Sequence, residues 1–205
     1  MTERLPERRP IRPELRVICG PMFSGKSEEL IKELRRAPHA KYKVMAFKPE
    51  LDYRRGEESI NSQDGSKFPA TSIRDPKQIL EMVTSDIDIV GIDEAQFFDE
   101  NIVDVCLELL RRGKKVIVAG LDKNFRGEPF GPMAALKQEA DHTDTLHAYC
   151  AVCGEPASFT QRVLNGEPAK YDDPIVAVGA DELYQARCRS HHEVPGKPRR
   201  RFGEE

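Results

Sequence analysis

Eight residues near the N-terminus have the types and spacing of a phosphate-binding loop. The segment 20–27 fits the pattern G-x-x-x-x-G-K-[ST] at every fixed position. In such a loop the glycines let backbone N–H groups turn toward phosphate oxygens, the lysine reaches the β and γ phosphates, and the last hydroxyl binds Mg²⁺. The alternative is a glycine turn that contains Lys-Ser by chance. The predicted phosphate-binding residues are Gly20, Pro21, Met22, Phe23, Ser24, Gly25, Lys26 and Ser27.

Two acidic residues follow a buried apolar run. The segment 89–94 reads Ile-Val-Gly-Ile-Asp-Glu. A strand that delivers carboxylates into a cleft is costly unless the charges meet a cation. We therefore predict that Asp93 holds Mg²⁺, directly or through water, and that Glu94 lies beside the γ-phosphate as a base or water-positioning group. The alternative interpretation is that Glu94 only caps the next helix.

Soft metal ligands occur in two closely spaced pairs late in the chain. Cys150 and Cys153 form a C-x2-C pair, and Cys188 and His191 form a C-x2-H pair. This set matches tetrahedral Zn²⁺, and four protein ligands leave no open position, so the predicted zinc is structural. It would clip a long polar loop that lacks a core of its own. His192 could take the place of His191, and unligated thiols are the alternative.

The elements that must position these groups are visible as alternating patterns. Asp75, Pro76 and Gln78 stand at the N-cap, N1 and N3 positions of one predicted helix. A later helix is predicted to bury Ile102, Val103, Cys106, Leu107 and Leu110. The alternation predicts an α/β fold with a parallel sheet covered on both faces. Strands are expected at 15–19, 44–47, 87–92 and 116–119, and helices at 28–36, from 75 onward and at 102–110.

Composition limits the classes of protein to which the chain can belong. The 205 residues carry a net charge of -3, so the chain has no overall positive potential that would attract nucleic acid. No apolar run approaches the roughly 18–20 residues that span a bilayer, and the Arg-rich start has no signal-peptide core. We therefore expect a cytoplasmic protein with reduced thiols, in which Cys19 and Cys106 are core residues.

Composition also divides the chain. We expect disordered tails at 1–14 and 195–205, because both are rich in Arg and Pro and lack apolar periodicity. Between them, residues 15–147 are predicted to form the phosphate-binding α/β domain. Residues 148–194, here called the lasso segment, are too polar for a large core and are predicted to form a small metal-anchored unit.

These motifs together closely resemble those of the type II thymidine kinases, over about residues 15–195. The matching features are the loop at 20–27, the sequence Asp-Glu-Ala-Gln-Phe-Phe at 93–98 and the late Cys and His pairs. The resemblance implies a RecA-like P-loop domain with a zinc-anchored lasso that closes over the nucleoside. It implies transfer of the ATP γ-phosphoryl group to the 5′-hydroxyl of thymidine. Further matches occur at 48–52, 121–122, 125–131, 178–180, 184 and 187–189.

The resemblance also implies roles for individual residues. Glu94 would be the base, and Gln96 would join Lys26, Ser27 and Asp93 in handling ATP and Mg²⁺. The family forms homotetramers and is inhibited by thymidine triphosphate. Without the resemblance, ordinary core packing would be the first interpretation of the phenylalanines. The residues implied to contact the nucleoside are Met22, Phe97, Leu121, Phe125, Phe130, Thr160, Ile175, Val176, Val178, Gly179 and Tyr184.

One departure from the family pattern and one competing function stand beside this interpretation. Gln63 occupies a position where the family usually has His, which bears on any phosphate contact assigned to Arg54 in the same region. The competing function is a zinc-containing P-loop ATPase that acts on nucleic acid. The acidic balance between Cys153 and Cys188 argues against it, because a phosphate backbone requires basic residues. A non-catalytic zinc module is a third alternative, and the intact motifs argue against it.

Overall fold

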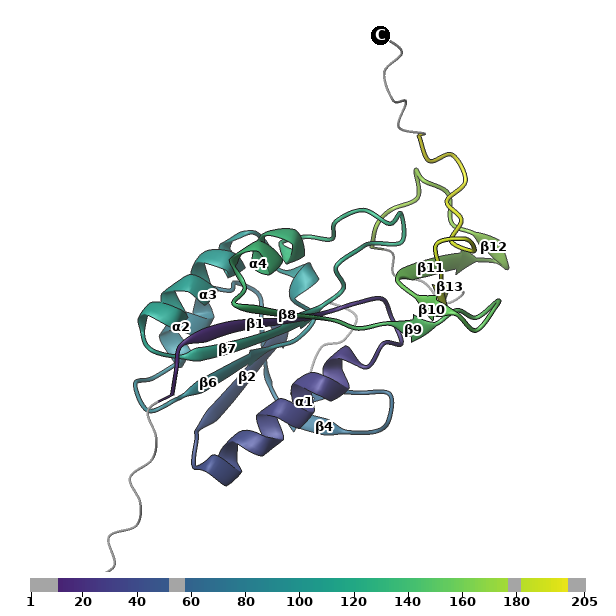
Figure 1. Ribbon diagram of the computed structural model, residues 1–205. Coiled ribbons are helices and arrows are strands. Elements are labelled where there is room, and N and C mark those ends of the chain that lie inside the picture. The colour runs from purple at the N-terminus through teal and green to yellow at the C-terminus, as the bar shows by residue number, and fades with distance from the viewer. Residues whose placement is uncertain (1–10, 52–57, 177–181, 199–205) are drawn as a thin grey trace, which may run out of the picture.

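We describe the protein from a computed structural model that covers residues 11–51, 58–176 and 182–198 (Figure 1). The predicted nucleoside contacts Val178 and Gly179, the possible phosphate contact of Arg54, and most of both predicted tails lie outside the described residues.

In the described chain, six parallel strands form the central sheet in the order β5-β2-β6-β7-β1-β8. The predicted α/β fold with a parallel sheet is confirmed. Four strands lie where the apolar runs predicted them. The sequence analysis missed the two edge strands, which are short, and β8 reads His-Thr-Asp-Thr without apolar residues. The strands are β1 (Glu14–Cys19), β2 (Val44–Pro49), β5 (Thr71–Ile73), β6 (Ile89–Ile92), β7 (Lys115–Gly120) and β8 (His142–Thr145).

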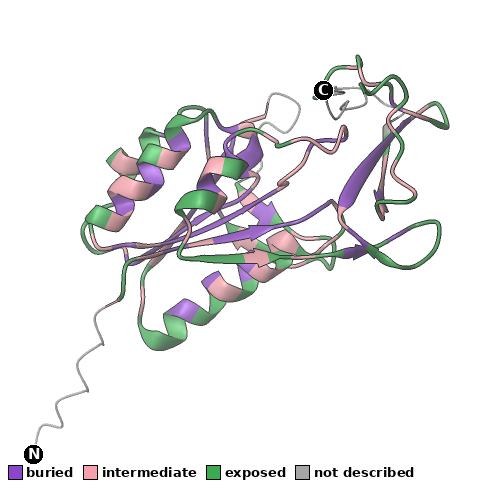
Figure 2. Ribbon diagram, turned by 45° about the horizontal axis from the view of Figure 1, so that its top comes forward, coloured by how far each residue is buried: buried purple, intermediate pink, exposed green. Residues whose placement is uncertain are grey.

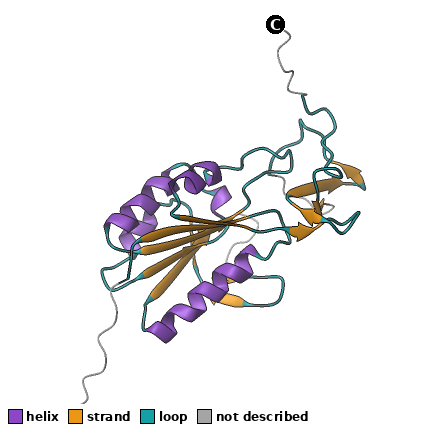
Figure 3. Ribbon diagram, in the orientation of Figure 1, coloured by secondary structure: helices purple, strands orange, loops and turns teal. Residues whose placement is uncertain are grey.

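Helices cover both faces of this sheet (Figures 1 and 3). The helix α1 (Lys26–Arg36), continued by the 3-10 turn η1 (Ala37–Ala40), packs on one face through Leu30, Ile31 and Leu34. The opposite face is covered by α2 (Gln78–Met82), α3 (Asn101–Arg111) and α4 (Met133–Glu139). Figure 2 shows that burial concentrates on the sheet and on the helix faces that touch it.

Two local predictions about the helices need correction. The helix predicted from Asp75 begins at Gln78, because residues 76–77 form a turn. The expected capping contacts still form, since Asp75 accepts the Lys77 N–H at 2.9 Å and the Gln78 side chain accepts the Asp75 N–H at 3.2 Å.

The buried face of α3 is also rotated from the predicted one. Val105 and Leu109 are buried with Ile102 and Cys106, whereas Val103, Leu107 and Leu110 are only partly buried. Sequence spacing alone left two overlapping apolar faces, and packing against the sheet selected one. Cys19 and Cys106 are fully buried core residues, as predicted, and burial raises the pKa of the Cys106 thiol to about 12.

The chain leaves the central sheet after Thr145 and builds small antiparallel sheets beyond one end of it (Figure 1). One pairs β9 (Ala148–Tyr149) with β10 (Pro156–Ala157), and the other has the order β12-β11-β13. Its strands are β11 (Phe159–Leu164), β12 (Glu167–Pro168) and β13 (Glu182–Arg187). A separate hairpin, β3 (Ser59–Asn61) with β4 (Lys67–Pro69), lies beside α1. Among the described residues, no helix is both long enough and apolar enough to cross a membrane.

Candidate functional site

The loop between β1 and α1 wraps around the start of the helix. Gly20 has φ +150°, and a Cβ atom at this position would lie 2.4 Å from the Leu146 carbonyl oxygen. Gly25 has φ +81° and is the N-cap of α1. The Lys26 Nζ donates a hydrogen bond to the Pro21 carbonyl oxygen at 2.6 Å, so the ammonium group is held over the loop. The loop therefore has the shape that the phosphate-binding motif requires.

The two halves of the predicted nucleotide site meet at a short hydrogen bond. The Ser27 hydroxyl donates to Asp93 Oδ2 at 3.0 Å, although the two residues come from α1 and the end of β6. Burial raises the pKa of Asp93 to about 6, with a further increase from Glu94. Burial also lowers the pKa of Lys26 to about 8, and Asp93 opposes that decrease. Both charges are costly in this pocket unless a phosphate and a cation accompany them.

The oxygen donors of this pair fit Mg²⁺. A carboxylate and a hydroxyl are hard ligands, and Mg²⁺ in nucleotide sites is commonly held by one or two protein oxygens together with phosphates. Asp93 is only 6% exposed, so its carboxylate is fixed against the loop rather than solvated.

Glu94 has an unusual backbone. Its φ and ψ are 50° and 37°, which is the left-handed region that few non-glycine residues adopt. The residue is at the N-cap position of the 3-10 turn η3 (Ala95–Phe97), but its side chain makes no capping hydrogen bond. The alternative that Glu94 only caps the next helix is therefore not supported. Strain of this kind collects at functional sites, where the surrounding structure maintains it.

A cavity of about 410 Å³ joins the phosphate-binding groups to an apolar compartment. Lys26, Ser27, Asp93 and Glu94 lie along it together with Phe23, Gly25 and Gln96. Three predicted loop residues do not line the cavity, namely Gly20, Pro21 and Ser24. The Pro21 carbonyl oxygen nevertheless accepts hydrogen bonds from Lys26 Nζ and from the Ser24 hydroxyl. The residues predicted to contact the nucleoside that line this cavity are Met22, Phe97, Leu121, Phe125, Phe130, Thr160, Ile175, Val176 and Tyr184.

The apolar compartment is built by the loops that follow β6 and β7. Phe97 and Phe130 meet edge to face, with ring centroids 5.5 Å apart and an interplanar angle of 81°. Gln96 joins the two loops, because its side-chain oxygen accepts the Leu121 N–H at 3.0 Å. Gly131 packs directly on Gln96, since a Cβ there would lie 2.3 Å from the Gln96 carbonyl oxygen. Such paired aromatic and aliphatic walls suit a flat ring with an apolar edge.

Seven further cavity residues were not predicted as site residues by the sequence analysis. Asn124 is buried and shapes the loop after β7, since its side-chain oxygen accepts the N–H groups of Arg126 and Glu128 at 2.9 and 3.2 Å. An Asn three residues before a Gly is a turn signal that could have marked this loop. The missed residues are Glu28, Asn61, Ser62, Gln63, Gly120, Lys123 and Asn124.

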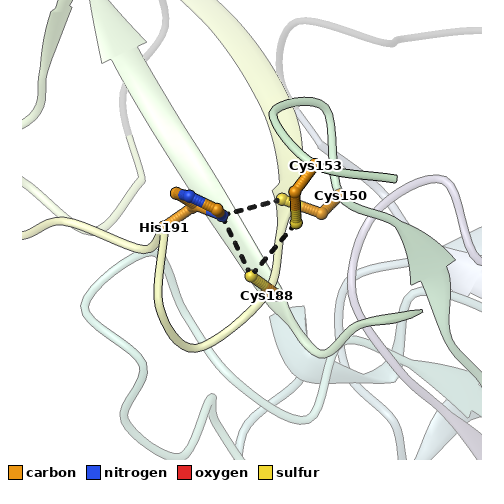
Figure 4. A group of neighbouring side chains, drawn as sticks. All are labelled: Cys150, Cys153, Cys188 and His191. Carbon is orange, nitrogen blue, oxygen red and sulfur yellow. Dashed lines mark hydrogen bonds between the residues drawn. The ribbon is translucent and has the colours of Figure 1, made fainter. Parts of the chain in front are cut away.

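The predicted metal ligands converge in the structure (Figure 4). The sulfurs of Cys150, Cys153 and Cys188 and a nitrogen of His191 lie within 4.8 Å of one another. Cys153 Sγ and Cys188 Sγ are 3.8 Å apart, and His191 Nδ1 lies 3.7 Å from Cys150 Sγ and 3.2 Å from Cys188 Sγ. Tetrahedral zinc with bonds of about 2.3 Å to sulfur and 2.0 Å to nitrogen requires edges of roughly 3.5–3.8 Å.

The electrostatics of the cluster also fit a metal. Burial opposes ionisation of Cys150, but N–H groups of Cys188, Cys153 and Val152 direct hydrogen bonds at its sulfur and its pKa falls to about 5. A thiolate is the form that binds zinc. The cluster therefore fits a four-coordinate zinc.

The structure also decides between the two adjacent histidines. His191 points into the cluster, whereas the His192 ring donates from Nε2 to the Phe125 carbonyl oxygen at 2.8 Å. The His192 ring also stacks on Phe159, with centroids 4.7 Å apart. The fourth ligand position therefore belongs to His191, and His192 ties the metal-binding turn to the cavity wall.

Comparison with protein families identifies a match over most of the chain. The family model described as thymidine kinase matches residues 13–192, which is most of the chain and includes both motifs and the Cys and His cluster.

Proposed function

The chain belongs to the thymidine kinase family of ATP-dependent kinases, and from this premise we propose that it transfers the γ-phosphoryl group of ATP to the 5′-hydroxyl of thymidine. The products are thymidine monophosphate and ADP. The observation that carries the proposal is the cavity in which the phosphate-loop groups and the apolar walls share one space. A site of that kind can hold a triphosphate and a nucleoside end to end.

The phosphate end is assigned to three side chains. Lys26 pairs with the β and γ phosphates, and the loop N–H groups surround their oxygens. Ser27 and Asp93 would hold Mg²⁺, which when bound neutralises charge on the phosphate oxygens. Since burial disfavours the charged forms of Lys26 and Asp93, a bound nucleotide and metal should stabilise both charges and move the two pKa values back toward their ordinary range.

Glu94 is assigned as the base. Its carboxylate accepts the proton of the 5′-hydroxyl as that oxygen forms its bond to the γ-phosphorus and the bond from phosphorus to the β-phosphate oxygen breaks. The proposal is supported by the cavity lining, in which Glu94 stands with both Asp93 and Phe97. The left-handed backbone of Glu94 fixes the direction in which the side chain leaves the strand.

The base of the nucleoside is assigned to the apolar end. Phe97, Phe125 and Phe130 offer ring faces and edges to thymine, while Ile175 and Val176 approach from the lasso segment. A wall contributed by a separate segment can exclude water, which would otherwise accept the phosphoryl group. The zinc would act only as a structural anchor for that segment, because Cys150, Cys153, Cys188 and His191 fill its coordination shell.

The remaining expectations from family resemblance belong to the same proposal. We propose a homotetramer, feedback inhibition by thymidine triphosphate at the nucleoside site, and a cytoplasmic location in which the four zinc ligands stay reduced. The motif and cavity evidence bears on the single chain. Mass measurement in solution tests the tetramer, and inhibition that thymidine relieves competitively tests the inhibitor.

The reaction itself is tested with purified protein, ATP, Mg²⁺ and each nucleoside in turn. The proposal expects a 5′-monophosphate from thymidine, with or without product from deoxyuridine, and ADP in equal amount. ATP turnover that requires DNA and yields no nucleoside monophosphate would instead support the competing ATPase.

A further inference from the structure

Two arginines from separate elements hold the stretch of chain that leads to the lasso wall of the cavity. This stretch is residues 169–174, which follow β12. Arg126, in the loop after β7, donates from Nη2 to the Asp173 carbonyl oxygen at 3.0 Å. Arg162, in β11, donates from Nη1 to the Pro174 carbonyl oxygen at 2.5 Å. The two carbonyls are consecutive, so two independent parts of the fold fix one peptide unit and its neighbour.

The same two guanidinium groups also lie against a residue of the cavity wall. The guanidinium carbons of Arg126 and Arg162 lie 5.6 and 5.4 Å from the Phe125 ring centroid. Arg126 is closer still to Tyr171, at 4.6 Å from its ring centroid. Cation–π contacts of this length add to the hydrogen bonds and favour Arg over Lys, because the planar group stacks and donates at once. Phe125 and the lasso stretch are therefore held by the same pair of side chains.

Arg162 is connected further to the phosphate-binding loop. It is only 2% exposed, and it lies two residues after Thr160 in β11, so both side chains leave the same face of the strand. The Thr160 hydroxyl accepts the Met22 N–H at 2.9 Å. One face of β11 thus contacts the phosphate-binding loop, the Phe125 loop and the lasso stretch.

Residues 170–173 form a turn with hydrogen bonds of its own, so contacts at the end of the stretch can position the whole of it. The Lys170 N–H donates to the Asp173 carboxylate at 2.7 Å, and the Asp173 N–H donates to the Lys170 carbonyl oxygen at 3.0 Å. The Tyr171 hydroxyl donates to Glu128 at 3.2 Å. These contacts give the turn a shape, and the arginine contacts place its end, immediately before Ile175 and Val176.

We propose that Arg126 and Arg162 are positioning residues that set the distance between the lasso wall, at Ile175 and Val176, and the aromatic wall at Phe125. This inference rests on the proposed function, because the ligand between the two walls is taken to be the nucleoside. The contacts described for the two arginines run to the 169–174 stretch and to the ring of Phe125. Their loss therefore weakens binding of the nucleoside and leaves binding of ATP intact.

The first variant is Arg126→Met, because this side chain is half-buried and Met keeps its length without the charge or the donors. Loss of a charge-assisted hydrogen bond corresponds to about a tenfold to hundredfold change in a binding constant. We expect the KM for thymidine to rise about tenfold or more, with the KM for ATP unchanged. We also expect faster amide hydrogen exchange over 169–176 in the absence of nucleoside, with zinc content retained.

Two further variants separate positioning from general stability. Arg162→Lys keeps the buried charge but loses the planar stack, and should raise the KM for thymidine by a smaller factor than Arg126→Met. Arg189→Met is the matched control, because Arg189 also stacks on an aromatic ring, with its guanidinium carbon 5.0 Å from the Phe159 ring centroid, but this contact is not with the 169–174 stretch. Its KM values should equal those of the wild type.

The outcomes distinguish this inference from the proposed function. Wild-type activity on thymidine together with an unchanged thymidine KM in Arg126→Met would overturn the inference and leave the function standing. An equal rise in both KM values would show general destabilisation and would also overturn it. Absence of thymidine phosphorylation by the wild type would overturn the proposed function and the nucleoside role of the arginines together.

Discussion

Residues 93 and 94 are adjacent in sequence but have opposite environments. Asp93 continues the buried strand and is hydrogen-bonded to Ser27, whereas Glu94 turns into the left-handed region and is only partly buried. Both side chains line the cavity, but the Asp93 carboxylate is held by the loop hydroxyl, whereas the left-handed backbone of Glu94 directs its side chain from a separate turn. A metal-binding role and a proton-accepting role can therefore be assigned to neighbours without conflict.

The base role of Glu94 is tested by Glu94→Gln. The amide keeps the size and polarity of the side chain but cannot accept a proton, so kcat should fall by about 10²–10⁴-fold, the usual weight of a general base. ATP binding, measured by calorimetry, should remain. Glu100→Gln changes an exposed carboxylate just before α3 and should leave kcat unaltered. Full turnover in Glu94→Gln would remove Glu94 from this role.

At the scale of elements, the helix that presents the phosphate-binding loop is fixed to the sheet by a cluster of charges. Arg16 in β1 contacts Asp144 in the edge strand β8 at 2.6 Å, and it contacts Glu29 and Glu33 of α1 at 3.5 and 3.3 Å. One side chain thus ties α1 to two strands. The edge strand that carries no apolar pattern is held by this pair and by its ladder to β1.

The Arg16 cluster predicts a dependence of stability on pH. Partial burial opposes ionisation of Asp144, but the hydrogen bond and charge of Arg16 outweigh it and hold the pKa of Asp144 below its ordinary value. Because the folded state binds this proton less readily than the unfolded state, the stabilisation is present above about pH 4 and is lost as pH falls further.

Asp144→Asn should therefore lower the free energy of unfolding by about 1 kcal/mol at pH 7 and by less at pH 3. Urea unfolding at both pH values measures this. Glu139→Gln, an exposed change at the end of α4, is the control. Its free energy of unfolding should equal that of the wild type at both pH values. A deficit in Asp144→Asn that stays constant from pH 7 to pH 3 would contradict the assignment.

At the scale of the molecule, the lasso segment is joined to the sheet domain by polar contacts rather than by a shared core. Among its described residues, the apolar cluster is formed by Ala148, Cys150, Ala157 and Ala186, with Cys188 packed beside them. Phe159, Val163 and Ala169 are the other buried apolar residues of the described part of the segment. Hydrogen bonds to the sheet domain include those from the Met22 N–H to Thr160 and from His192 to the Phe125 carbonyl oxygen. They also include those from Arg126 to the Asp173 carbonyl oxygen and from Tyr171 to Glu128. A unit with a small apolar core is expected to gain its order from a metal bound at the Cys and His cluster.

Removal of zinc should therefore loosen the lasso segment and leave the central sheet folded. Cys153→Ser, or treatment with a strong chelator, should make Arg162, Lys170 and Arg187 the first sites of tryptic cleavage, while the circular dichroism of the sheet domain changes little. Readdition of zinc to the chelated wild type should restore protease resistance. Unaltered resistance after verified metal loss would count against a structural metal.

Thr160→Val tests the contact between β11 and the phosphate-binding loop. Valine matches the shape of threonine but leaves the Met22 N–H without its acceptor, a loss of about 1–3 kcal/mol or roughly tenfold or more in an equilibrium constant. We expect higher KM values for both ATP and thymidine, because the hydrogen bond joins the phosphate-binding loop, through Met22, to a residue that lines the proposed nucleoside site. Thr160→Ser retains the hydroxyl and should restore most of the affinity; equal defects in the two variants would argue against the hydrogen bond.

How much of this arrangement was predictable depends on how local its cause is. The phosphate-binding loop, the acidic strand end and the cysteine pairs are contiguous patterns, and their chemistry follows from residue type and spacing. The missed cavity residues Asn61, Lys123 and Asn124 come from a hairpin and a loop whose positions depend on the strands around them. The short edge strands β5 and β8 were not predicted from the sequence, because neither has a periodic pattern of apolar residues.

The sequence by itself determined which groups are present and the order in which strands and helices deliver them, because apolar periodicity and motif spacing act over a few residues. The tertiary structure alone decided that Ser27 meets Asp93, that His191 rather than His192 joins the cysteines, and that two arginines hold the lasso wall. Each of these contacts joins segments that are not adjacent along the chain. Such contacts are set by how the sheet, the loops and the lasso segment pack together, and no local pattern encodes that packing.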